Sequence, residues 1–509
     1  MYWFLLLVAV HSAACAKILA IAPTPLYSHQ SVFRSIWSEL SQRGHHVTLI
    51  TTNPMKNPTL TNLTEIDISF TYKLVFEDHQ MQYVVNTESN IVKLMAHVFF
   101  VMNNMTSEQL KHPQVEALVK SDDHFDLMVV EAHVPAWFGL AKKFDCPLII
   151  VTSLPATNFF KGVVGNMHNL VYTHSFDLPF GEDLSFVQRV ICVLFGIFDG
   201  IQNRYLLYPF QERIIRETLG DEKIDLIDIV QNVSLMITNE IPGFSKVITH
   251  IPSMVHTNGL QIQPPQDLPS DLKQFLDEAP NGVIYVSLGS TVKSYLMSHE
   301  KKFVLFEVLA GLAYKVVWKL EEKVDQVPPN VKVVSWAPQQ DILRHPNTKL
   351  FISQGGLQSI DEAIRFKVPI LGIPFFGDQF YNSIRVKELK LGSWIELHTL
   401  TKEKLKEVIL ETVDNSTYLK NLEEMSGLME HPLKSVDKAV WWIEYVIRHK
   451  GAIHLRSPLA GMPFYQYYLL DVGGFLLVFF IVGAFISLRL AKLAWKQFRQ
   501  RTFTKVKLQ

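Results

Sequence analysis

Apolar runs of strand length alternate with amphipathic helical stretches along the first half of the chain. An apolar run at residues 17–22 is followed by a helical pattern over residues 31–43 and by a second apolar run at residues 47–51. Further apolar runs lie at residues 127–131 and 148–151. Short buried strands separated by helices are typical of a parallel sheet with helices on both faces. The first half is therefore predicted to be an α/β domain.

The same alternation begins again beyond residues 262–269, a proline-rich stretch that we interpret as the joint between two domains. Apolar runs lie at residues 283–287, 315–320 and 331–335, and a helical pattern ends at residue 313. We predict two doubly wound sheets that face each other across a cleft. Ligands of such open sheets bind outside the carboxyl ends of the strands, so one ligand is expected in the cleft.

A pair of glycines follows the next apolar run and opens a helical pattern. Gln354 precedes Gly355 and Gly356 at this point. The first amides of a helix have no partner within the helix, and they lie at the positive end of its dipole. Because this combination binds anions, we predict a phosphate seat at the two glycines.

Side chains that bind hydroxyl groups surround this predicted phosphate seat. Gln358 and Glu362 are four residues apart and so share one face of the helix. An apolar run at residues 369–376 is predicted to be the next buried strand, and it leads to Asp378 and Gln379 at the same rim. The segment therefore offers phosphate donors and hydroxyl acceptors together.

With its glutamate, its two prolines and its closing Asp-Gln pair, this segment resembles the signature of the UDP-glycosyltransferases. The resemblance extends upstream to Trp336, Gln339, Ser287 and Gly289, and it covers essentially the whole chain. It implies the GT-B fold, in which two Rossmann-like domains face each other, and a membrane-anchored enzyme that uses a UDP-sugar as its co-substrate. The donor-binding residues that it implies are Ser287, Gly289, Trp336, Gln339, Gln354, Gly355, Gly356, Gln358, Glu362, Asp378 and Gln379.

The resemblance also implies a role for individual members of this set. Trp336 is expected to stack on the uracil. Gln339 and Glu362 are expected to hold the ribose and phosphates, together with the polar residues of the signature. Asp378 and Gln379 are expected to hold the sugar.

One position departs from the pattern, because most members of the family carry histidine where this chain has Gln354. Glutamine keeps an N–H donor but cannot become cationic, so donor binding is expected to depend more on backbone amides. Gln-Gly-Gly resembles the insect-type branch, whose members mostly use UDP-glucose. We therefore expect glucose, with glucuronic acid as the alternative sugar and a UDP-sugar binder with little turnover as the alternative function.

The candidate general base is His29, which is expected in a loop after the first strand, at the mouth of the cleft. The family's catalytic base occupies the matching place. Its orienting partner should be a carboxylate at the end of a neighbouring strand, and by resemblance Glu131 takes the place of the usual aspartate. Asp126 is the alternative partner, but it lies at the opposite end of the same strand.

These parts predict a direct displacement. His29 takes the proton of an acceptor hydroxyl, the oxygen attacks the anomeric carbon, and UDP leaves, so that an α-linked donor gives a β-glycoside. No metal is expected, because the chain has no Asp-x-Asp pair to hold one against UDP. A dehydrogenase is excluded, since no G-x-G-x-x-G follows the first strand of either half.

Composition narrows the classes of molecule that this protein is expected to bind. The 48 Lys and Arg residues balance 49 Asp and Glu residues, so nucleic acid is not expected, and 48% hydrophobic residues over 509 positions indicate a globular enzyme. Apolar residues within 159–207 fit a pocket for a small lipophilic hydroxyl acceptor or a face resting on a membrane, and plain core helices fit equally well. Cys146 and Cys192 are expected to be two buried thiols rather than one disulfide. A homo-oligomer is left open.

The two ends of the chain predict an enzyme of the endoplasmic reticulum membrane. Residues 1–16 indicate a secretory signal peptide. Residues 472–488 are uncharged and apolar, and as a helix of about 26 Å they match the reticulum core of roughly 27 Å. The seven basic and no acidic residues beyond them place the tail in the cytosol and the body in the lumen. Lys505 and Lys507 resemble a dilysine retrieval signal.

A lumenal body makes four sequons candidate glycosylation sites, at Asn62, Asn104, Asn232 and Asn415. The domain boundaries that we expect are a signal peptide (1–16), an acceptor-binding domain (17–261), a linker (262–280), a donor-binding domain with a return helix (281–450), a juxtamembrane segment (451–471), a transmembrane helix (472–488) and a basic tail (489–509).

Overall fold

The structure is a computed structural model of the chain, and it describes residues 15–76, 91–289, 297–322, 324, 326–430 and 433–506. The chain divides into two units, of which the first ends at Ser457 and the second begins at Pro458. Most of the predicted signal peptide, residues 1–14, and Lys507 of the predicted retrieval signal lie outside the described residues.

A seven-stranded sheet forms the centre of the N-terminal half. Its strands follow the order β3-β2-β1-β4-β5-β6-β7, and every neighbouring pair is parallel. The strands are β1 (Lys17–Ala22), β2 (His46–Thr51), β3 (Leu63–Asp67), β4 (Leu127–Glu131), β5 (Leu148–Val151), β6 (Leu235–Asn239) and β7 (Met254–Thr257). Along β1, Leu19 belongs to one apolar core while Ile18 and Ala20 belong to another, so both faces of the sheet are covered.

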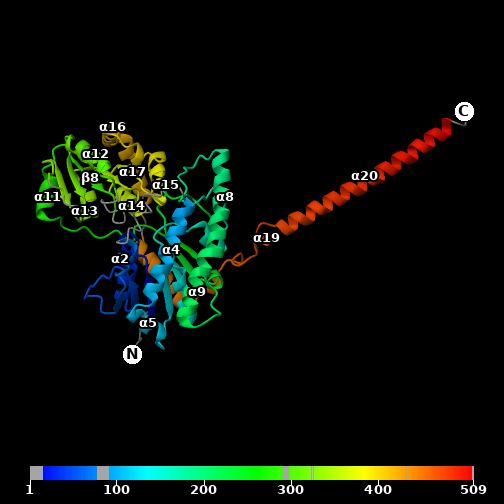
Figure 1. Cartoon of the computed structure of the whole chain (residues 1–509), viewed down its shortest axis with the longest axis horizontal. Coiled ribbons are helices and arrows are strands. Elements are labelled where there is room, and N and C mark those ends of the chain that lie inside the picture. Colours follow the sequence, from blue (N-terminus) through cyan, green and yellow to red (C-terminus); the bar gives the residue numbers. More distant parts are fainter. Residues whose placement is uncertain are drawn as a thin grey trace, which may run out of the picture. The chain divides into compact units, whose positions relative to one another are not determined.

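A six-stranded parallel sheet, in the order β10-β9-β8-β11-β12-β13, forms the centre of the C-terminal half. The strands are β8 (Val283–Ser287), β9 (Lys315–Lys319), β10 (Val331–Val334), β11 (Thr348–Ser353), β12 (Ile370–Gly372) and β13 (Gly392–Trp394). Figure 1 shows the first sheet in the lower part of the body and the second in the upper part. The prediction of two parallel α/β sheets is confirmed.

Helices connect the strands of both sheets. In the N-terminal half they are α1 (Tyr27–Gln42), α2 (Thr71–Phe76), α4 (Ile91–Leu110), α5 (Pro113–Lys120), η1 (Pro135–Gly139), α6 (Leu140–Lys143), α7 (Asn158–Val163), α8 (Phe186–Gln202), the π-helical η2 (Asn203–Leu207), α9 (Tyr208–Leu219) and α10 (Leu226–Gln231). The later helices are α11 (Ser270–Asp277), α12 (His299–Ala310), α13 (Gln339–Arg344), α14 (Leu357–Arg365), α15 (Asp378–Glu388), η4 (Leu397–Thr399), α16 (Lys402–Asp414), α17 (Ser416–Leu428), α18 (Ser435–Arg448), η5 (Ile453–Leu455), α19 (Phe464–Tyr467) and α20 (Leu470–Val506).

Two predicted elements differ from the observed ones. Helix α1 begins at Tyr27, so His29 lies in its first turn rather than in a loop, because the Gln30 side chain donates to the carbonyls of Ala22 and Thr24 at 2.9 Å each and holds the turn close to β1. The strand predicted at residues 369–376 is shorter in the structure, where β12 covers only Ile370–Gly372.

That strand, β12, ends at Gly372 for a specific reason. The amide of Ile373 still donates to Ser353, at 2.7 Å, but Pro374 has no amide. The next two amides, of Phe375 and Phe376, donate to the side-chain oxygen of Gln379 at 2.9 and 3.2 Å. The chain therefore leaves the sheet before it reaches α15.

Helix α18 belongs to the core of the N-terminal half although it follows the second sheet in the chain. Its apolar face contributes Ala439, Val440, Ile443 and Val446 to the core that covers β1, β2 and α1. Arg43, next to the end of α1, donates to Asp437 of α18 at 2.8 Å. The return helix therefore completes the first half.

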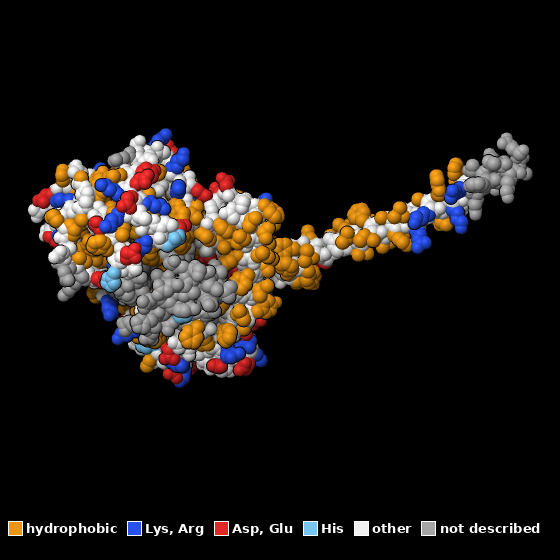
Figure 2. All heavy atoms as spheres, turned by 45° about the horizontal axis from the view of Figure 1, so that its top comes forward, with side chains coloured by type: hydrophobic (Ala, Val, Ile, Leu, Met, Phe, Trp, Pro, Cys, Tyr) orange, Lys and Arg blue, Asp and Glu red, His pale blue; other side chains and the backbone are white. Residues whose placement is uncertain are grey.

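Helix α8 presents an apolar face to the outside of the body, where hydrophobic side chains gather in Figure 2. The exposed side chains are Phe186, Val187, Val190, Ile191, Leu194, Ile197, Phe198 and Ile201. The interpretation of this segment as a plain core helix is therefore wrong, and a membrane-facing or ligand-facing role stays a prediction. Cys192 of α8 is buried, whereas Cys146 is half-buried rather than buried as expected, and both are free thiols in the structure.

Two stretches are long and apolar enough to cross a membrane by length and composition: residues 186–219 and residues 470–499. The first runs from α8 into α9 and is partly buried. The second lies in α20 and includes the predicted span at residues 472–488. Helix α20 fits a membrane anchor.

The return helix allows a test of the fold. Ile443→Ala should lower the free energy of unfolding of the body by about 2 to 5 kcal/mol, the usual cost of truncating a buried isoleucine. Trp441, which is 47% exposed on the same helix, supplies the control, and Trp441→Ala should have a smaller effect. Thermal unfolding followed by circular dichroism in detergent gives both values. Equal midpoints for the Ile443→Ala and wild-type proteins would contradict the assignment.

Candidate active site

The carboxyl ends of β1 and β4 bring a histidine and a carboxylate together. The two strands are neighbours, so His29 in the first turn of α1 meets Glu131, the last residue of β4. His29 Nδ1 lies 3.2 Å from Glu131 Oε1, and the amide of Thr24 donates to Glu131 Oε2 at 3.2 Å. The carboxylate is completely buried, whereas the His29 side chain is 12% exposed. With Nδ1 turned to the carboxylate, Nε2 is the ring nitrogen left to act on a ligand.

Asp126, the alternative partner, lies at the other end of β4. Its carboxylate accepts from the amide of Lys17 at 2.8 Å, at the start of β1. Of the two carboxylates considered from the sequence, Glu131 is thus the one beside His29.

The buried pair has shifted pKa values. Burial by itself raises the pKa of Glu131, but the contacts with His133 and His29 outweigh it and hold the pKa at about 2. Burial lowers the pKa of His29, with a contribution from His133, against the opposing effect of Glu131. His29 is therefore neutral and Glu131 charged at neutral pH, which is the state in which an imidazole can accept a proton.

Two glycines bring backbone close to Gln354 and to α15. Gly355 has φ +86°, and a Cβ there would lie 2.5 Å from Ser383 Oγ. Gly289 has φ +85°, and a Cβ there would lie 2.3 Å from Gln354 Nε2. Both positions favour glycine by conformation, and at Gly355 the backbone oxygen of Gln379, 2.9 Å from the added Cβ, leaves no room for a side chain. Gln354 Oε1 is buried and has no hydrogen-bond partner among the described residues, so it is available to a ligand.

The amides predicted to receive phosphate do not all point outward. The amide of Gly355 donates to Ser353 Oγ at 3.2 Å, while Gly356 is the N-cap of α14, whose first-turn amides follow. Ser287 is buried at the end of β8 and pairs in register with Ser353 of β11. Gln358 donates to the carbonyl of Ser153 at 2.9 Å, so its side chain joins the two halves of the body.

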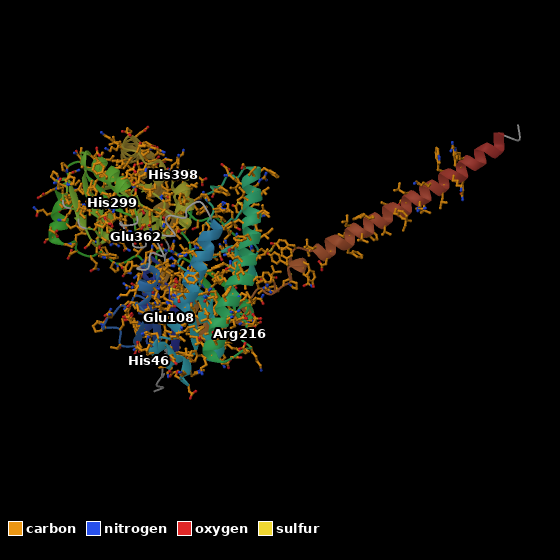
Figure 3. All side chains as sticks on the ribbon, in the orientation of Figure 1. His46, Glu108, Arg216, His299, Glu362 and His398 are labelled. Carbon is orange, nitrogen blue, oxygen red and sulfur yellow. The ribbon has the colours of Figure 1, made fainter. Side chains whose placement is uncertain are left out.

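Glu362 lies on the margin of the C-terminal half that faces the N-terminal half (Figure 3). Gln339 Nε2 donates to one of its oxygens at 2.7 Å, and Gln340 Nε2 donates to the other at 2.8 Å. Burial raises the pKa of Glu362 to about 7 in spite of these bonds. The arrangement leaves a buried carboxyl group that is oriented by two amides, which suits a ligand hydroxyl.

Trp336 is 57% exposed in the loop after β10, an unusual position for a large aromatic ring. Its ring meets the edge of Tyr27, with centroids 5.1 Å apart, and the ammonium of Lys319 lies 5.4 Å from its centroid. Since Tyr27 is two residues before His29, the exposed ring and the buried pair belong to neighbouring parts of the cleft.

Asp378 and Gln379 open α15 with different surroundings. Asn382 Nδ2 donates to Asp378 Oδ2 at 2.7 Å, and burial raises the pKa of Asp378 to about 6. The side-chain oxygen of Gln379 is committed to the backbone that leaves β12. Asp378 is therefore the more available of the two for a ligand.

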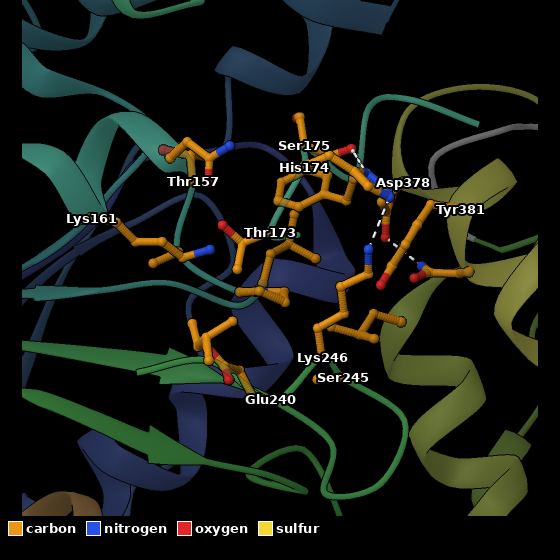
Figure 4. Close-up of a pocket in the computed structure, with 18 of the residues that line it drawn as sticks. Thr157, Lys161, Thr173, His174, Ser175, Glu240, Ser245, Lys246, Asp378 and Tyr381 are labelled. Carbon is orange, nitrogen blue, oxygen red and sulfur yellow. Dashed lines mark hydrogen bonds between the residues drawn. The ribbon is translucent and has the colours of Figure 1, made fainter. Parts of the chain in front are cut away.

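A cavity of about 60 Å³ lies where the two halves meet, and Asp378 lines it together with Tyr381 of α15 (Figure 4). Lys161 of α7 extends its ammonium group into the cavity, and burial lowers its pKa to about 8. Lys246 donates to His174 Nε2 at 2.9 Å on the same wall. The cavity therefore combines cationic, imidazole and carboxyl groups.

Three of these residues were not found from the sequence. His133 follows Glu131 by two positions, and a Glu-x-His pattern at the end of a strand is a signal that would have found it. Lys161 and Lys246 carry no such signal, because a lone lysine is usually solvated and only the tertiary structure buries Lys161 and half-buries Lys246.

Comparisons with known proteins agree with this architecture. The family model described as "UDP-glucoronosyl and UDP-glucosyl transferase" matches residues 16–505. A UDP-glucosyltransferase 2 of Dactylopius coccus is 32% identical over 92% of both chains. The human 2-hydroxyacylsphingosine 1-beta-galactosyltransferase is 28% identical over 94% of this chain and 88% of its own.

Among solved structures, a UDP-glucosyltransferase from Polygonum tinctorium has a similar fold. It matches with a TM-score of 0.57 at 16% identity, over 85% of this chain and 99% of its own. The GT-B fold expected from the sequence is thereby confirmed. A family model that spans nearly the whole chain, a relative of nearly equal length and the same two-sheet fold show that this protein is an enzyme of the UDP-glucoronosyl and UDP-glucosyl transferase family.

Proposed function

We propose that this enzyme transfers glucose from UDP-glucose to a hydroxyl group of a small lipophilic acceptor, without a metal ion and with inversion at the anomeric carbon. The observation that carries the proposal is the contact of His29 with the buried Glu131. A neutral imidazole backed by a charged carboxylate is the arrangement of a general base.

In the reaction, His29 Nε2 removes the proton of the acceptor hydroxyl while that oxygen bonds to the anomeric carbon. The bond from the anomeric carbon to the phosphate oxygen breaks, and UDP leaves with its electron pair. Glu131 stabilises the imidazolium that forms, and the proton passes to solvent after the product leaves. An α-linked donor gives a β-glycoside because the acceptor enters on the face opposite the phosphate.

The C-terminal half supplies the donor seat in this proposal. Trp336 stacks on the uracil, the buried Glu362 receives ribose hydroxyls, and the first turn of α14 receives phosphate. Asp378 receives sugar hydroxyls at the edge of the cavity between the halves. Further contacts in the donor seat are assigned to Ser287, Gly289, Gln339, Gln354, Gly355, Gly356 and Gln379.

The sugar is assigned from similarity and from charge. The Dactylopius coccus relative is named as a glucosyltransferase, which favours glucose. Glucuronic acid is the second candidate, since the ammonium of Lys161 shares a cavity with Asp378 and could neutralise a sugar carboxylate. Comparing turnover with UDP-glucose and with UDP-glucuronic acid decides between the two.

We also propose that the body lies in the lumen of the endoplasmic reticulum, anchored by α20 with a cytosolic tail. The uncharged stretch of α20 followed by basic residues supports this orientation. The apolar face of α8 then rests against the membrane or guides lipophilic acceptors to the cleft.

The base assignment predicts a large loss of rate. His29→Ala should reduce kcat by about 10² to 10⁴-fold, the usual contribution of general-base catalysis. Glu131→Gln should reduce it less, and the double mutant should be far from additive because the two side chains act as one unit. Glucosyl transfer to a phenolic acceptor measures all three. Donor affinity, measured by calorimetry with UDP, should stay unchanged, and near wild-type turnover in His29→Ala would exclude His29 as the base.

The donor seat predicts that two mutations separate binding from transfer. Trp336→Ala should weaken UDP binding by about 1 to 3 kcal/mol, since a stacking surface is lost. Asp378→Asn should leave UDP affinity nearly intact and reduce the rate of sugar transfer. Calorimetry with UDP and steady-state kinetics with the UDP-sugar provide the two readouts. Equal losses of UDP affinity in both mutants would show that the uracil and sugar ends are assigned wrongly.

The orientation predicts the outcome of protease protection in sealed microsomes. Protease should remove only the tail after α20, and endoglycosidase should increase the gel mobility of the protected body if sequons such as Asn232 are used. A detergent-permeabilised sample serves as the control, in which the body is digested as well. Digestion of the body in sealed vesicles would place it in the cytosol.

A further inference from the structure

A second imidazole lies at the carboxylate that orients His29. His133 Nδ1 is 3.4 Å from Glu131 Oε1, the same oxygen that His29 Nδ1 approaches at 3.2 Å. The two rings lie side by side, with centroids 4.9 Å apart and a tilt of 56°. Each of the three side chains offers one possible ligand atom, and these three atoms lie within 4.8 Å of one another.

The His29 contact has the geometry of a hydrogen bond but lies at the long end of the usual range, and the His133 contact is longer still. Charge-assisted bonds between nitrogen and a carboxylate are usually about 2.7 to 2.9 Å long, shorter than either contact. His133 Nδ1 is buried and has no hydrogen-bond partner among the described residues, although a buried ring nitrogen normally has one. The cluster therefore holds a buried ring nitrogen whose contact with Glu131 Oε1, at 3.4 Å, lies outside the geometry of a good hydrogen bond.

The spacing instead fits tetrahedral coordination. Metal–ligand bonds of about 2.0 to 2.1 Å to zinc place neighbouring ligand atoms roughly 3.3 to 3.4 Å apart. The two measured distances, 3.2 and 3.4 Å, are close to that value. The amide of Thr24 already holds the second oxygen of Glu131, as outer groups hold the carboxylate ligands of metal sites.

We propose that His29, Glu131 and His133 form a binding site for Zn²⁺ or a similar transition-metal cation, and that the bound ion inhibits the enzyme. Two imidazoles and one carboxylate select such an ion over Mg²⁺, which prefers oxygen ligands. The side chains of His29 and His133 are 12% and 33% exposed, so solvent can reach the site and supply a fourth ligand. The inhibition rests on the proposed role of His29, whereas the binding does not.

The ion would act on the base in two ways. Bound to His29 Nδ1, it replaces the contact with Glu131 that orients the ring. Its charge also makes Nε2 less basic, so that the acceptor proton is no longer removed. Donor binding is unaffected, because the donor seat belongs to the C-terminal half.

Titration with Zn²⁺ tests the site in the full-length, untagged chain in detergent, since a polyhistidine tag binds zinc. Turnover should fall as Zn²⁺ is added, recover when a chelator is added, and be unaffected by Mg²⁺ at the same concentrations. His133→Ala should raise the Zn²⁺ concentration that halves turnover by about 10-fold or more. His133→Gln, which preserves size and polarity, should do the same. The turnover of each protein is expressed relative to its own rate without zinc.

A second histidine cluster provides the matched control. Glu240, His250 and His256 also bring three ligand atoms within 4.8 Å, and His256 Nε2 likewise has no hydrogen-bond partner among the described residues, but His256 Nδ1 contacts Thr238 Oγ1 at 2.7 Å and Glu240 Oε1 at 3.1 Å, and none of these residues contacts His29 or Glu131 in the contacts given above. His256→Ala should therefore leave zinc inhibition unchanged. A loss of inhibition in His256→Ala, or unchanged inhibition in both His133 variants, would overturn the proposal.

Calorimetry with Zn²⁺ on the UDP-bound protein separates this proposal from the proposed reaction. One binding event that disappears in both His133 variants, while UDP binding persists, supports the metal site even if no acceptor is turned over. Absence of zinc binding in the wild-type protein would refute the site whatever the activity.

Discussion

A charged carboxylate shut off from water determines the geometry of the N-terminal half of the site. Glu131 is completely buried, and a buried charge is stable only where donors or opposite charges surround it. The amide of Thr24, in the segment that joins β1 to α1, and the ring of His29, in the first turn of α1, provide such contacts. The need to satisfy Glu131 therefore fixes the start of α1, and with it the direction of the imidazole. Replacing this carboxylate is therefore expected to change the position of the His29 imidazole as well as the charge beside it.

Local patterns in the sequence predicted the two sheets and the identity of many residues at the cleft, but they did not predict the strands β3, β6, β7 and β13. The buried strands are short, apolar and bounded by turns, so their positions follow from composition, and the ends of neighbouring strands must meet. Three features could not be read in this way. The first turn of α1 is stabilised by Gln30, the end of β12 is decided by Gln379, and Gln358 bonds across to Ser153. Each depends on a hydrogen bond from a side chain to the backbone, which the pattern of apolar residues does not encode, and the bond of Gln358 also depends on the tertiary structure.

Two contacts join the halves of the body across the cleft, one from α14 and one between aromatic rings. Helix α14 turns Glu362 toward Gln339 and Gln340 and turns Gln358 toward the N-terminal half, so one helix serves both the predicted donor seat and the junction. Tyr27 and Trp336 form a second contact across the cleft. Any change in the spacing of the halves must therefore break a buried hydrogen bond and separate two aromatic rings, which ties the donor seat to the position of the base.

The place of α18 has a consequence for the order in which the protein is made. The core over β1, β2 and α1 includes Val440 and Ile443, which leave the ribosome only after the entire second sheet. The first half of the nascent chain can pair its strands early, but one of its faces is covered only in part, by α1, until the return helix arrives. Translation of this protein therefore passes through a long interval in which part of this apolar face is exposed, and a chain that stops between β8 and α18 lacks the residues that cover it.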